Sequence, residues 1–158
     1  MTKILKFVAA MILAFVPGII GVMFTPSGGS DMWYNALNRS VLTPDGWVFG
    51  VAWTVLYALI GIALFLIMNT TVRGSIGKTK SYTLFGVQMI LNALWTYLFF
   101  GAHMIGAAFI VILMLIFITV WMMRAFFAVN RSAGYLLIPY VAWLLFATYL
   151  NGVILYLN

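Results

Sequence analysis

Five long apolar runs, separated by short polar connections, set the pattern of this chain. A helix needs about 20 mostly apolar residues to cross the hydrocarbon core of a bilayer. Stretches of that kind occupy residues 4–24, 45–68, 82–100, 107–127 and 135–157. The connections carry Gly, Pro, Ser, Asn and Thr, which favour turns. The pattern predicts an all-α integral membrane protein, in which a five-transmembrane-helix bundle forms one domain over residues 1–158.

The composition agrees with a membrane protein and excludes other classes. Hydrophobic residues make up 66% of the chain and charged residues 6%, whereas soluble domains carry about 25% charged residues. The net charge of +6 is not gathered into the dense basic face that nucleic-acid binders need, so no nucleic-acid partner is expected. The chain has no cysteine, which removes thiolate chemistry. The first apolar run is long for a signal peptide, so we interpret it as a retained span.

The basic residues predict which end of the bundle faces the cytoplasm. With five spans, one end carries Lys3, Lys6, Arg73, Lys78, Lys80, Arg124 and Arg131, and the other carries Arg39, Asp31, Asp45 and His103. Lys and Arg in short connections stay on the cytoplasmic side. The bias therefore predicts a cytoplasmic N-terminus, and an even number of spans would destroy it.

The connection before residue 45 is the longest, and it is not uniformly polar. It contains Trp33, Tyr34, Leu37 and Leu42. Two interpretations are open: these side chains pack on the bundle as a lid, or they anchor the loop at the membrane interface, which Trp and Tyr also favour.

Amide and aromatic side chains recur at helical spacing inside three of the spans. Residues three, four and seven apart share one face of a helix. Such stripes are formed by Gly50, Trp53 and Tyr57, by Gln88, Asn92 and Trp95, and by Tyr140, Trp143, Ala147 and Asn151. A buried amide needs a partner inside the bundle, and flat aromatic faces suit a planar apolar ligand. The stripes predict either a shared cavity or polar contacts between helices, and spacing alone leaves both open.

Known catalytic and metal-binding motifs are absent from the sequence. It contains no nucleophile–base pair, phosphate loop or HExxH-type motif. His103 is the only histidine and has no cysteine companion, so we interpret it as a surface residue and predict no metal site. The spans hold no carboxylate near their middle, which argues against an ion-coupled transporter.

Three blocks of residues are more specific than these general features. They are Trp33-Tyr34 with Leu37, Thr43-Pro44, Trp47 to Gly50, Trp53-Thr54 and Leu56-Tyr57; Gln88 with Leu91-Asn92, Leu94-Trp95 and Phe99-Phe100; and Pro139-Tyr140 with Trp143 and Phe146 to Asn151. In this combination, and over its whole length, the chain resembles the TspO/MBR family, which comprises the tryptophan-rich sensory proteins and the translocator proteins, once called peripheral-type benzodiazepine receptors. The start of the chain does not look like a transit sequence, which favours a bacterial member in the bacterial cell membrane.

The resemblance implies a membrane receptor or sensor that binds porphyrins, notably protoporphyrin IX, and benzodiazepine-type ligands in a pocket among the helices. By this resemblance Trp53 and Trp143 are the principal pocket residues. Tyr34, Gln88, Asn92, Trp95 and Ala147 would surround them, and the stripes add Tyr57 and Tyr140. A homodimer is also implied. No cofactor is required, and protoporphyrin IX is the expected ligand. Porphyrin-degrading family members make Trp53 and Trp143 candidates for a light-dependent oxidative activity, which the sequence leaves undecided.

The residues before the second span depart from the family's pattern. The family usually shows Lys-Pro-Ser-Trp/Phe-x-Pro-Pro, whereas residues 39–45 here read Arg-Ser-Val-Leu-Thr-Pro-Asp. Fewer prolines predict a less rigid lid, and Asp45 brings a negative charge near the expected pocket mouth. A dianionic porphyrin is then expected to bind less well, or to turn its propionates toward Arg39. The weak cholesterol-recognition pattern is absent after Tyr156.

Two other functions fit the same sequence. One is a transporter of tetrapyrroles or other hydrophobic metabolites, although a short chain without internal repeats shows no alternating-access machinery. The other is a regulatory membrane partner protein without catalysis, in which the polar stripes only hold the helices together.

Overall fold

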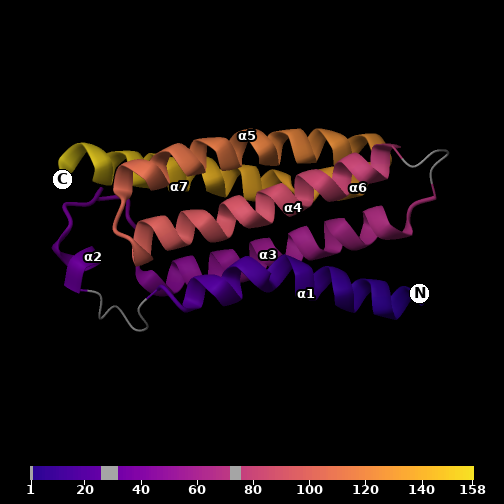
Figure 1. Cartoon of the computed structure of the whole chain (residues 1–158), viewed down its shortest axis with the longest axis horizontal. Helices are drawn as coiled ribbons and strands as arrows, with labels where there is room; N and C mark the ends of the chain where they lie inside the picture. Colours follow the sequence, from indigo (N-terminus) through magenta and orange to yellow (C-terminus); the bar gives the residue numbers. More distant parts are fainter. Residues whose placement is uncertain (1, 26–31, 72–75) are drawn as a thin grey trace.

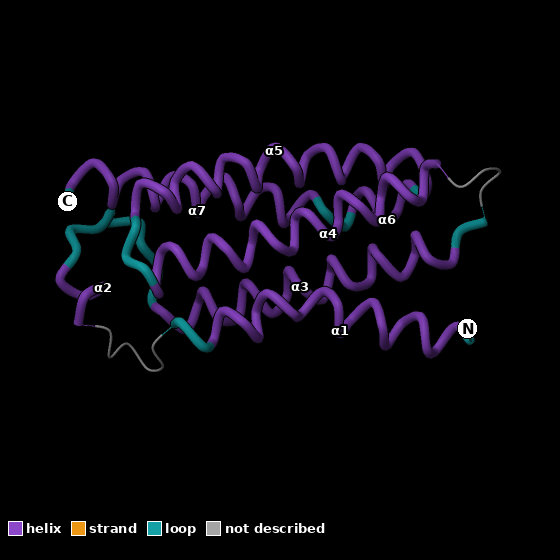
Figure 2. The backbone as a smooth tube through the Cα atoms, in the orientation of Figure 1, coloured by secondary structure: helices purple, strands orange, loops and turns teal. Residues whose placement is uncertain are grey.

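Long helices lying side by side make up the molecule, as Figure 1 shows. The computed structural model describes residues 2–25, 32–71 and 76–158. Its elements are α1 (Lys3–Val22), α2 (Met32–Ala36), α3 (Gly46–Asn69), α4 (Ile76–Thr96) with a following π-helical turn η2 (Tyr97–Gly101), α5 (Ile105–Val129), α6 (Arg131–Tyr135) and α7 (Ile138–Leu157). Throughout the described ranges the backbone is helix or short connection, without strands (Figure 2). The predicted all-α fold class is confirmed.

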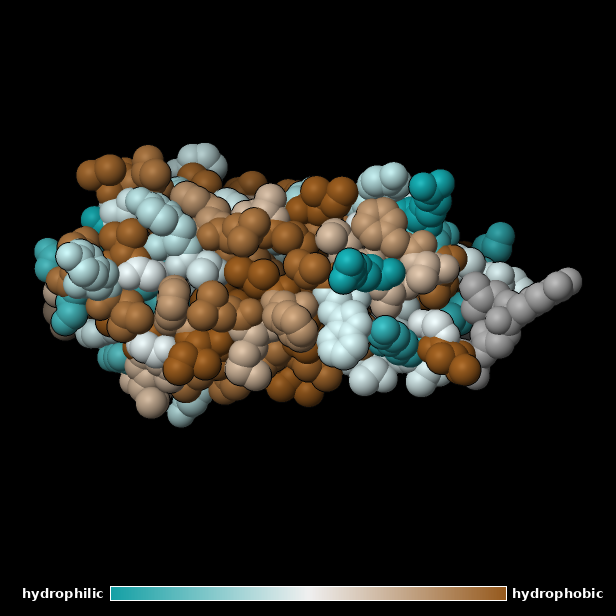
Figure 3. Space-filling view, turned by 90° about the horizontal axis from the view of Figure 1, so that it is seen from above, coloured by the Kyte–Doolittle hydropathy of each residue, from teal (hydrophilic) through white to brown (hydrophobic). Residues whose placement is uncertain are grey.

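The length and surface of the helices fit a bilayer. When η2 is counted with α4 and α6 with α7, five helices of the described chain are 20 to 27 residues long and apolar enough to cross a membrane. Large apolar side chains such as Ile12, Ile110 and Phe117 face outward, which is costly in water and acceptable in lipid. Figure 3 shows an apolar belt across the middle of the visible face, with hydrophilic residues toward the ends. The predicted integral membrane protein is therefore confirmed.

The N-terminus and the C-terminal end of α3 lie at one end of the bundle, and the C-terminus and α2 lie at the other (Figure 1). At the N-terminal end, Lys6 Nζ and Lys78 Nζ each donate to the carbonyl oxygen of Met68 at 3.4 Å. Basic groups suit the negative end of a helix dipole, here the C-terminus of α3. Two residues of the predicted charge bias, Arg73 and Asp31, lie outside the described residues. That this end faces the cytoplasm stays a prediction.

The helices pack in two main pairs, α1 along α3 and α4 along α5, and α7 completes the bundle against α5. A glycine allows the first of these contacts. A Cβ on Gly61 would lie 2.6 Å from Sδ of Met11 and 3.3 Å from its Cα. The absence of a side chain at Gly61 is what lets α1 approach α3 so closely.

The end of α4 widens into the π-helical turn η2. The N–H of Ala102 donates to the carbonyl oxygen of Tyr97 at 2.8 Å, across five residues. Turns of this kind shift the faces of a helix and are frequent at functional sites. Here the turn buries Phe99 while Phe100 remains half-buried beside it. His103 then reverses the chain with a φ of 57°, a conformation that L-residues seldom adopt.

Candidate functional site

A large cavity lies at the α2 end of the bundle. Its volume is about 1430 Å³, and its lining comes from α1, α2 and the loop that follows it, α3, the end of α4 with η2, and α7. Aromatic rings dominate the walls: Phe15, Tyr34, Trp47, Phe49, Trp53, Tyr57, Trp95, Phe99 and Phe100. Ligand pockets for drug-sized molecules are usually about 300–1,000 Å³. The cavity can therefore accommodate a ligand larger than most, with flat apolar faces on several sides.

The roof of the cavity is formed in part by α2 and its loop. Trp33 stacks on His103 with ring centroids 3.9 Å apart and an interplanar angle of 9°, and it meets Phe99 edge-on at 5.8 Å. Tyr34 contacts the rings of Phe99 and Phe100. Through these contacts α2 packs on η2 and on the turn at His103.

Of the two interpretations of the loop, packing on the bundle describes Trp33, Tyr34 and Leu37, which pack around Phe99. Leu42 does not share this position, because 60% of its surface is exposed. His103 is exposed as expected, although its ring serves as a platform for Trp33. In the described part of the chain, no group of three or more His, Cys, Asp or Glu side chains is placed to hold a metal ion.

Hydrogen bonds tie the loop to the end of α7. The N–H of Asn38 donates to Oδ1 of Asn158 at 2.9 Å, and Nδ2 of Asn158 returns a bond to the carbonyl oxygen of Asn38 at 3.0 Å. Two residues along, the hydroxyls of Ser40 and Tyr149 share a hydrogen bond at 3.0 Å. We call these three bonds the loop clasp. The clasp fixes the loop on α7, in a chain that has fewer prolines in this loop than the family pattern.

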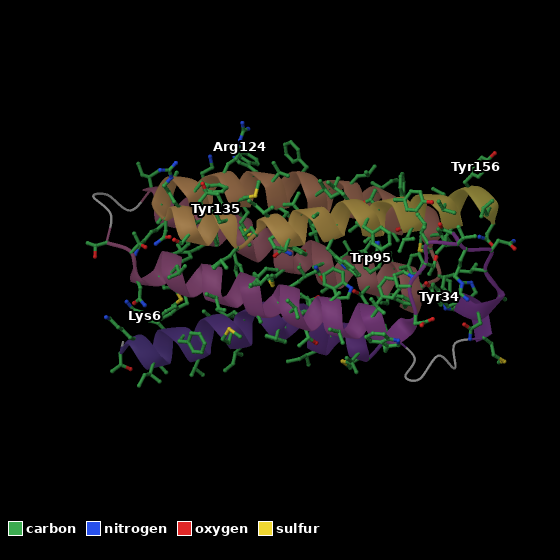
Figure 4. The ribbon with its side chains drawn as sticks, turned by 180° about the vertical axis from the view of Figure 1, so that it is seen from behind. Lys6, Tyr34, Trp95, Arg124, Tyr135 and Tyr156 are labelled. Carbon is green, nitrogen blue, oxygen red and sulfur yellow. The ribbon has the colours of Figure 1, made fainter. Side chains whose placement is uncertain are left out.

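Of the three tryptophans that line the cavity, Trp53 and Trp95 are each stacked on another ring. Trp53 lies against Tyr57 at 5.4 Å between centroids, and Trp95 lies against Phe99 at the same distance. Nε1 of Trp95 donates to Oδ1 of Asn151 at 3.1 Å, so its polar group is satisfied and its orientation fixed. Figure 4 shows Trp95 among the helices and Tyr34, a residue of α2, at the end opposite Lys6. The wall therefore presents ordered rings rather than free ones.

A buried polar network lies deeper in the bundle. The Tyr57 hydroxyl donates to Oδ1 of Asn92 at 2.8 Å, and Nδ2 of Asn92 donates to the Tyr140 hydroxyl at 2.8 Å. Nε2 of Gln88 also donates to the Tyr140 hydroxyl. All four side chains are buried. Amides in an apolar bundle need such partners, and this network connects α3, α4 and α7.

The predicted pocket residues fall into three places. Tyr34, Trp53, Tyr57, Trp95 and Ala147 line the cavity. Gln88, Asn92 and Tyr140 belong to the buried network, which meets the cavity lining at Tyr57 and at Trp53, whose ring centroid lies 6.2 Å from that of Tyr140.

Trp143 lies to the side of the cavity. Its ring contacts Phe49 and Phe146, and its buried Nε1 has no hydrogen-bond partner among the described residues. Whether any of these nine residues binds a ligand stays a prediction.

The first helix also contributes to the cavity, and sequence reasoning did not include it. Phe15, Gly18 and Val22 of α1 line one side. Their spacing of three and four residues is the only signal they carry, and every apolar transmembrane helix offers several such rows. Trp47 and Phe49, quoted for the family resemblance, line the cavity as well.

Comparison with known proteins gives a consistent result. The sequence model described as "TspO/MBR family" matches residues 9–157. The chain is 36% identical to the tryptophan-rich protein TspO of Archaeoglobus fulgidus, over 99% of each chain. It is 32% identical to a tryptophan-rich sensory protein of Cereibacter sphaeroides, over 90% of this chain and 84% of the relative. Identity with the translocator protein of Ovis aries is 32%, over 85% and 79% of the two chains.

Proposed function

This chain belongs to the TspO/MBR family, and we propose that it is a membrane receptor that binds a porphyrin, protoporphyrin IX above all, in the aromatic cavity. The observation that carries the proposal is the combination of about 1430 Å³ of space with walls rich in aromatic rings. A tetrapyrrole is a large, flat, mostly apolar molecule, and offset ring stacking is the contact such walls provide. Smaller planar ligands of the benzodiazepine type would use part of the same space.

Trp53 is the main stacking residue in this proposal. Its indole is half-buried, lines the cavity, and is backed by Tyr57. Trp95 offers a second ring on the opposite helix pair, held by Asn151. Each aromatic contact contributes about 0.5–1.5 kcal/mol beyond its buried area, so losing one indole should weaken binding measurably without abolishing it.

The test is a titration of purified protein in detergent with protoporphyrin IX in the dark, followed by the porphyrin absorbance. We expect saturable binding, weakened about tenfold by Trp53→Leu, in line with the loss of about 1.4 kcal/mol of stacking. Trp143→Leu removes an indole that does not line the cavity and serves as the matched control, with affinity expected within about twofold of the wild type. Equal weakening by both variants would place the ligand elsewhere, and absence of saturable binding in folded protein would end the proposal.

A second, light-dependent activity is favoured by the position of Trp53 and Trp95 in the cavity wall. A photoexcited porphyrin transfers its energy to dioxygen, and the activated oxygen adds to a double bond of the macrocycle or of an adjacent indole. Dioxygen is the oxidant, and no metal is needed. Illuminated protoporphyrin should bleach more slowly in Trp53→Phe than in Trp143→Phe at equal occupancy. Identical bleaching in both variants would remove Trp53 from the chemistry.

Measuring the passage of a tetrapyrrole across a membrane that contains the protein distinguishes transport from binding. Liposomes that contain the protein should hold a fluorescent tetrapyrrole at the protein without accelerating its passage across the bilayer. Protein-dependent passage, sensitive to Trp53→Leu, would favour the transporter alternative, which the name of the translocator proteins suggests for those relatives.

A further inference from the structure

Two ionised side chains line the cavity in the described part of the chain. Among the described residues of the lining, Arg39 is the one cation and Asp45 the one anion. Both belong to the loop that joins α2 to α3, and the remaining lining residues are apolar or neutral. Among the described lining residues, a positive charge for an acidic group of a ligand is therefore offered at the loop end of the cavity.

Arg39 is held in a defined place. Its guanidinium carbon lies 4.7 Å from the centroid of the Tyr34 ring, and that ring packs on Phe99 and Phe100 at 6.2 and 5.7 Å. An arginine over an aromatic face keeps the N–H groups at its rim available. Planar guanidinium groups bind carboxylates with two parallel hydrogen bonds. Stacking on Tyr34 thus leaves Arg39 with N–H groups that can donate to a carboxylate.

The residues on both sides of Arg39 are fixed by the loop clasp. Asn38 exchanges two backbone–amide hydrogen bonds with Asn158, and Ser40 shares one with Tyr149. A flexible arginine on a free loop would lose conformational entropy on binding. Because the residues on either side of Arg39 are already anchored to α7, the loop loses less conformational entropy when a ligand binds.

We propose that Arg39 is the carboxylate-binding residue of this cavity, positioned by the loop clasp and by Tyr34, and that Asp45 disfavours a second acidic group. The inference rests on the proposed function and names its ligand class: planar ligands that carry a carboxylate at the loop end. Asp45 lines the same cavity and forms no side-chain hydrogen bond at the start of α3. Its carboxylate is therefore not engaged in capping α3, and at physiological salt it would repel an anionic group that came within roughly 8 Å.

Protoporphyrin IX and its dimethyl ester provide the test, because they share the macrocycle and differ in charge. We expect Arg39→Gln to weaken the acid about five- to tenfold and to leave the ester within about twofold, as loss of one partly solvated charged contact implies. Arg39→Lys should retain part of the preference, since it keeps the charge without the planar fork. Asp45→Asn should strengthen the acid about two- to threefold and leave the ester unchanged.

The positioning role of the clasp has its own readout. Asn158→Ala removes all three hydrogen bonds between the Asn158 side chain and Asn38 and should lower the preference for acid over ester, whereas ester affinity should stay the same. Tyr156→Ala is the matched control, because Tyr156 is in the same helix turn and 88% exposed; Figure 4 shows it pointing away from the bundle. A merely structural role of Asn158 would weaken both ligands alike.

The outcomes separate the two proposals. If neither porphyrin binds the wild-type protein saturably, the proposed function fails, and this inference fails with it. If both bind but Arg39→Gln weakens them equally or not at all, the porphyrin site stands and the role of Arg39 is wrong. Selective loss of the acid in Arg39→Gln supports both.

Discussion

At the scale of single residues, the buried polar network determines which side chains can be substituted without loss of stability. Tyr140 accepts hydrogen bonds from both Gln88 and Asn92, and no solvent reaches it because it is fully buried. A buried donor without an acceptor costs about 1–3 kcal/mol. The network therefore depends on one hydroxyl oxygen more than on any other atom.

Replacing Tyr140 with Phe removes that oxygen and leaves two amide donors without their acceptor. We expect a loss of about 1–3 kcal/mol in the free energy of unfolding, measured by thermal unfolding in detergent. Tyr149→Phe is the control on the same helix, because it removes a hydroxyl that is exposed and bonded only to Ser40 in the described chain. Its cost should be below about 1 kcal/mol. Equal shifts for the two variants would mean that the network adds nothing.

Spacing predicted this part of the bundle only to a limited extent. It placed Gln88 and Asn92 on one helix face and Tyr140 on another, and their burial agrees with faces that point inward. It could not predict that these residues bond to one another while Trp53 and Trp95 line open space. The helical period predicts the direction in which a side chain leaves the helix axis. It does not predict how far from the cavity the residue lies or which side chain of the next helix it contacts.

At the scale of elements, close packing of α1 on α3 forms one side of the cavity. Gly61 permits the approach, since any side chain there would collide with Met11. One helical turn farther along the same pair of helices, Phe15 of α1 packs on Tyr57 of α3, with ring centroids 5.7 Å apart. A wider separation of α1 and α3 would therefore move a wall of the site as well as the helix.

Gly61→Ala should cost about 1–3 kcal/mol of stability, because overpacking a closed contact forces the backbone or side chains to shift. Gly86→Ala, a glycine within α4 whose Cβ would meet nothing within 4 Å, is the matched control and should be neutral or stabilising through helix propensity. Thermal unfolding of both variants measures the difference. A stable Gly61→Ala variant would show that α1 and α3 are less tightly packed than described.

The loop before α3 shows why sequence left two interpretations open. Trp and Tyr favour a membrane interface and a packed lid equally. The difference arises from the π-helical turn η2, which places Phe99 and Phe100 under Trp33 and Tyr34. One extra residue in a helical turn has no clear sequence signal, so the receiving surface for the loop could not be predicted.

At the scale of the whole molecule, the described basic side chains gather at the N-terminal end, apart from Arg39. The hydrophobic pattern predicted the helical bundle because lipid imposes a minimum length and apolarity on every span. Orientation is a separate matter, since it depends on charge and on the membrane rather than on packing. The cytoplasmic N-terminus and the homodimer therefore stay predictions, which are to be tested on the protein in its membrane.

The absence of native cysteine makes orientation directly measurable. Val41→Cys lies in the loop before α3 at a position 99% exposed, and Ser132→Cys lies at the opposite end in α6, also exposed. In intact bacterial cells, a membrane-impermeant maleimide should label Val41→Cys and spare Ser132→Cys, which should react only after lysis. The reverse labelling would place the N-terminus outside.

The most direct test of the account is to fill the cavity and measure porphyrin binding. Ala147 lines the cavity and is 7% exposed, so Ala147→Leu adds volume where the ligand should lie. Ala142→Leu makes the same change on an exposed position of α7. In a dark titration with protoporphyrin IX, we predict that Ala147→Leu weakens binding at least tenfold while Ala142→Leu binds like the wild type. Unchanged affinity in a folded Ala147→Leu protein would contradict the assignment of the cavity as the binding site.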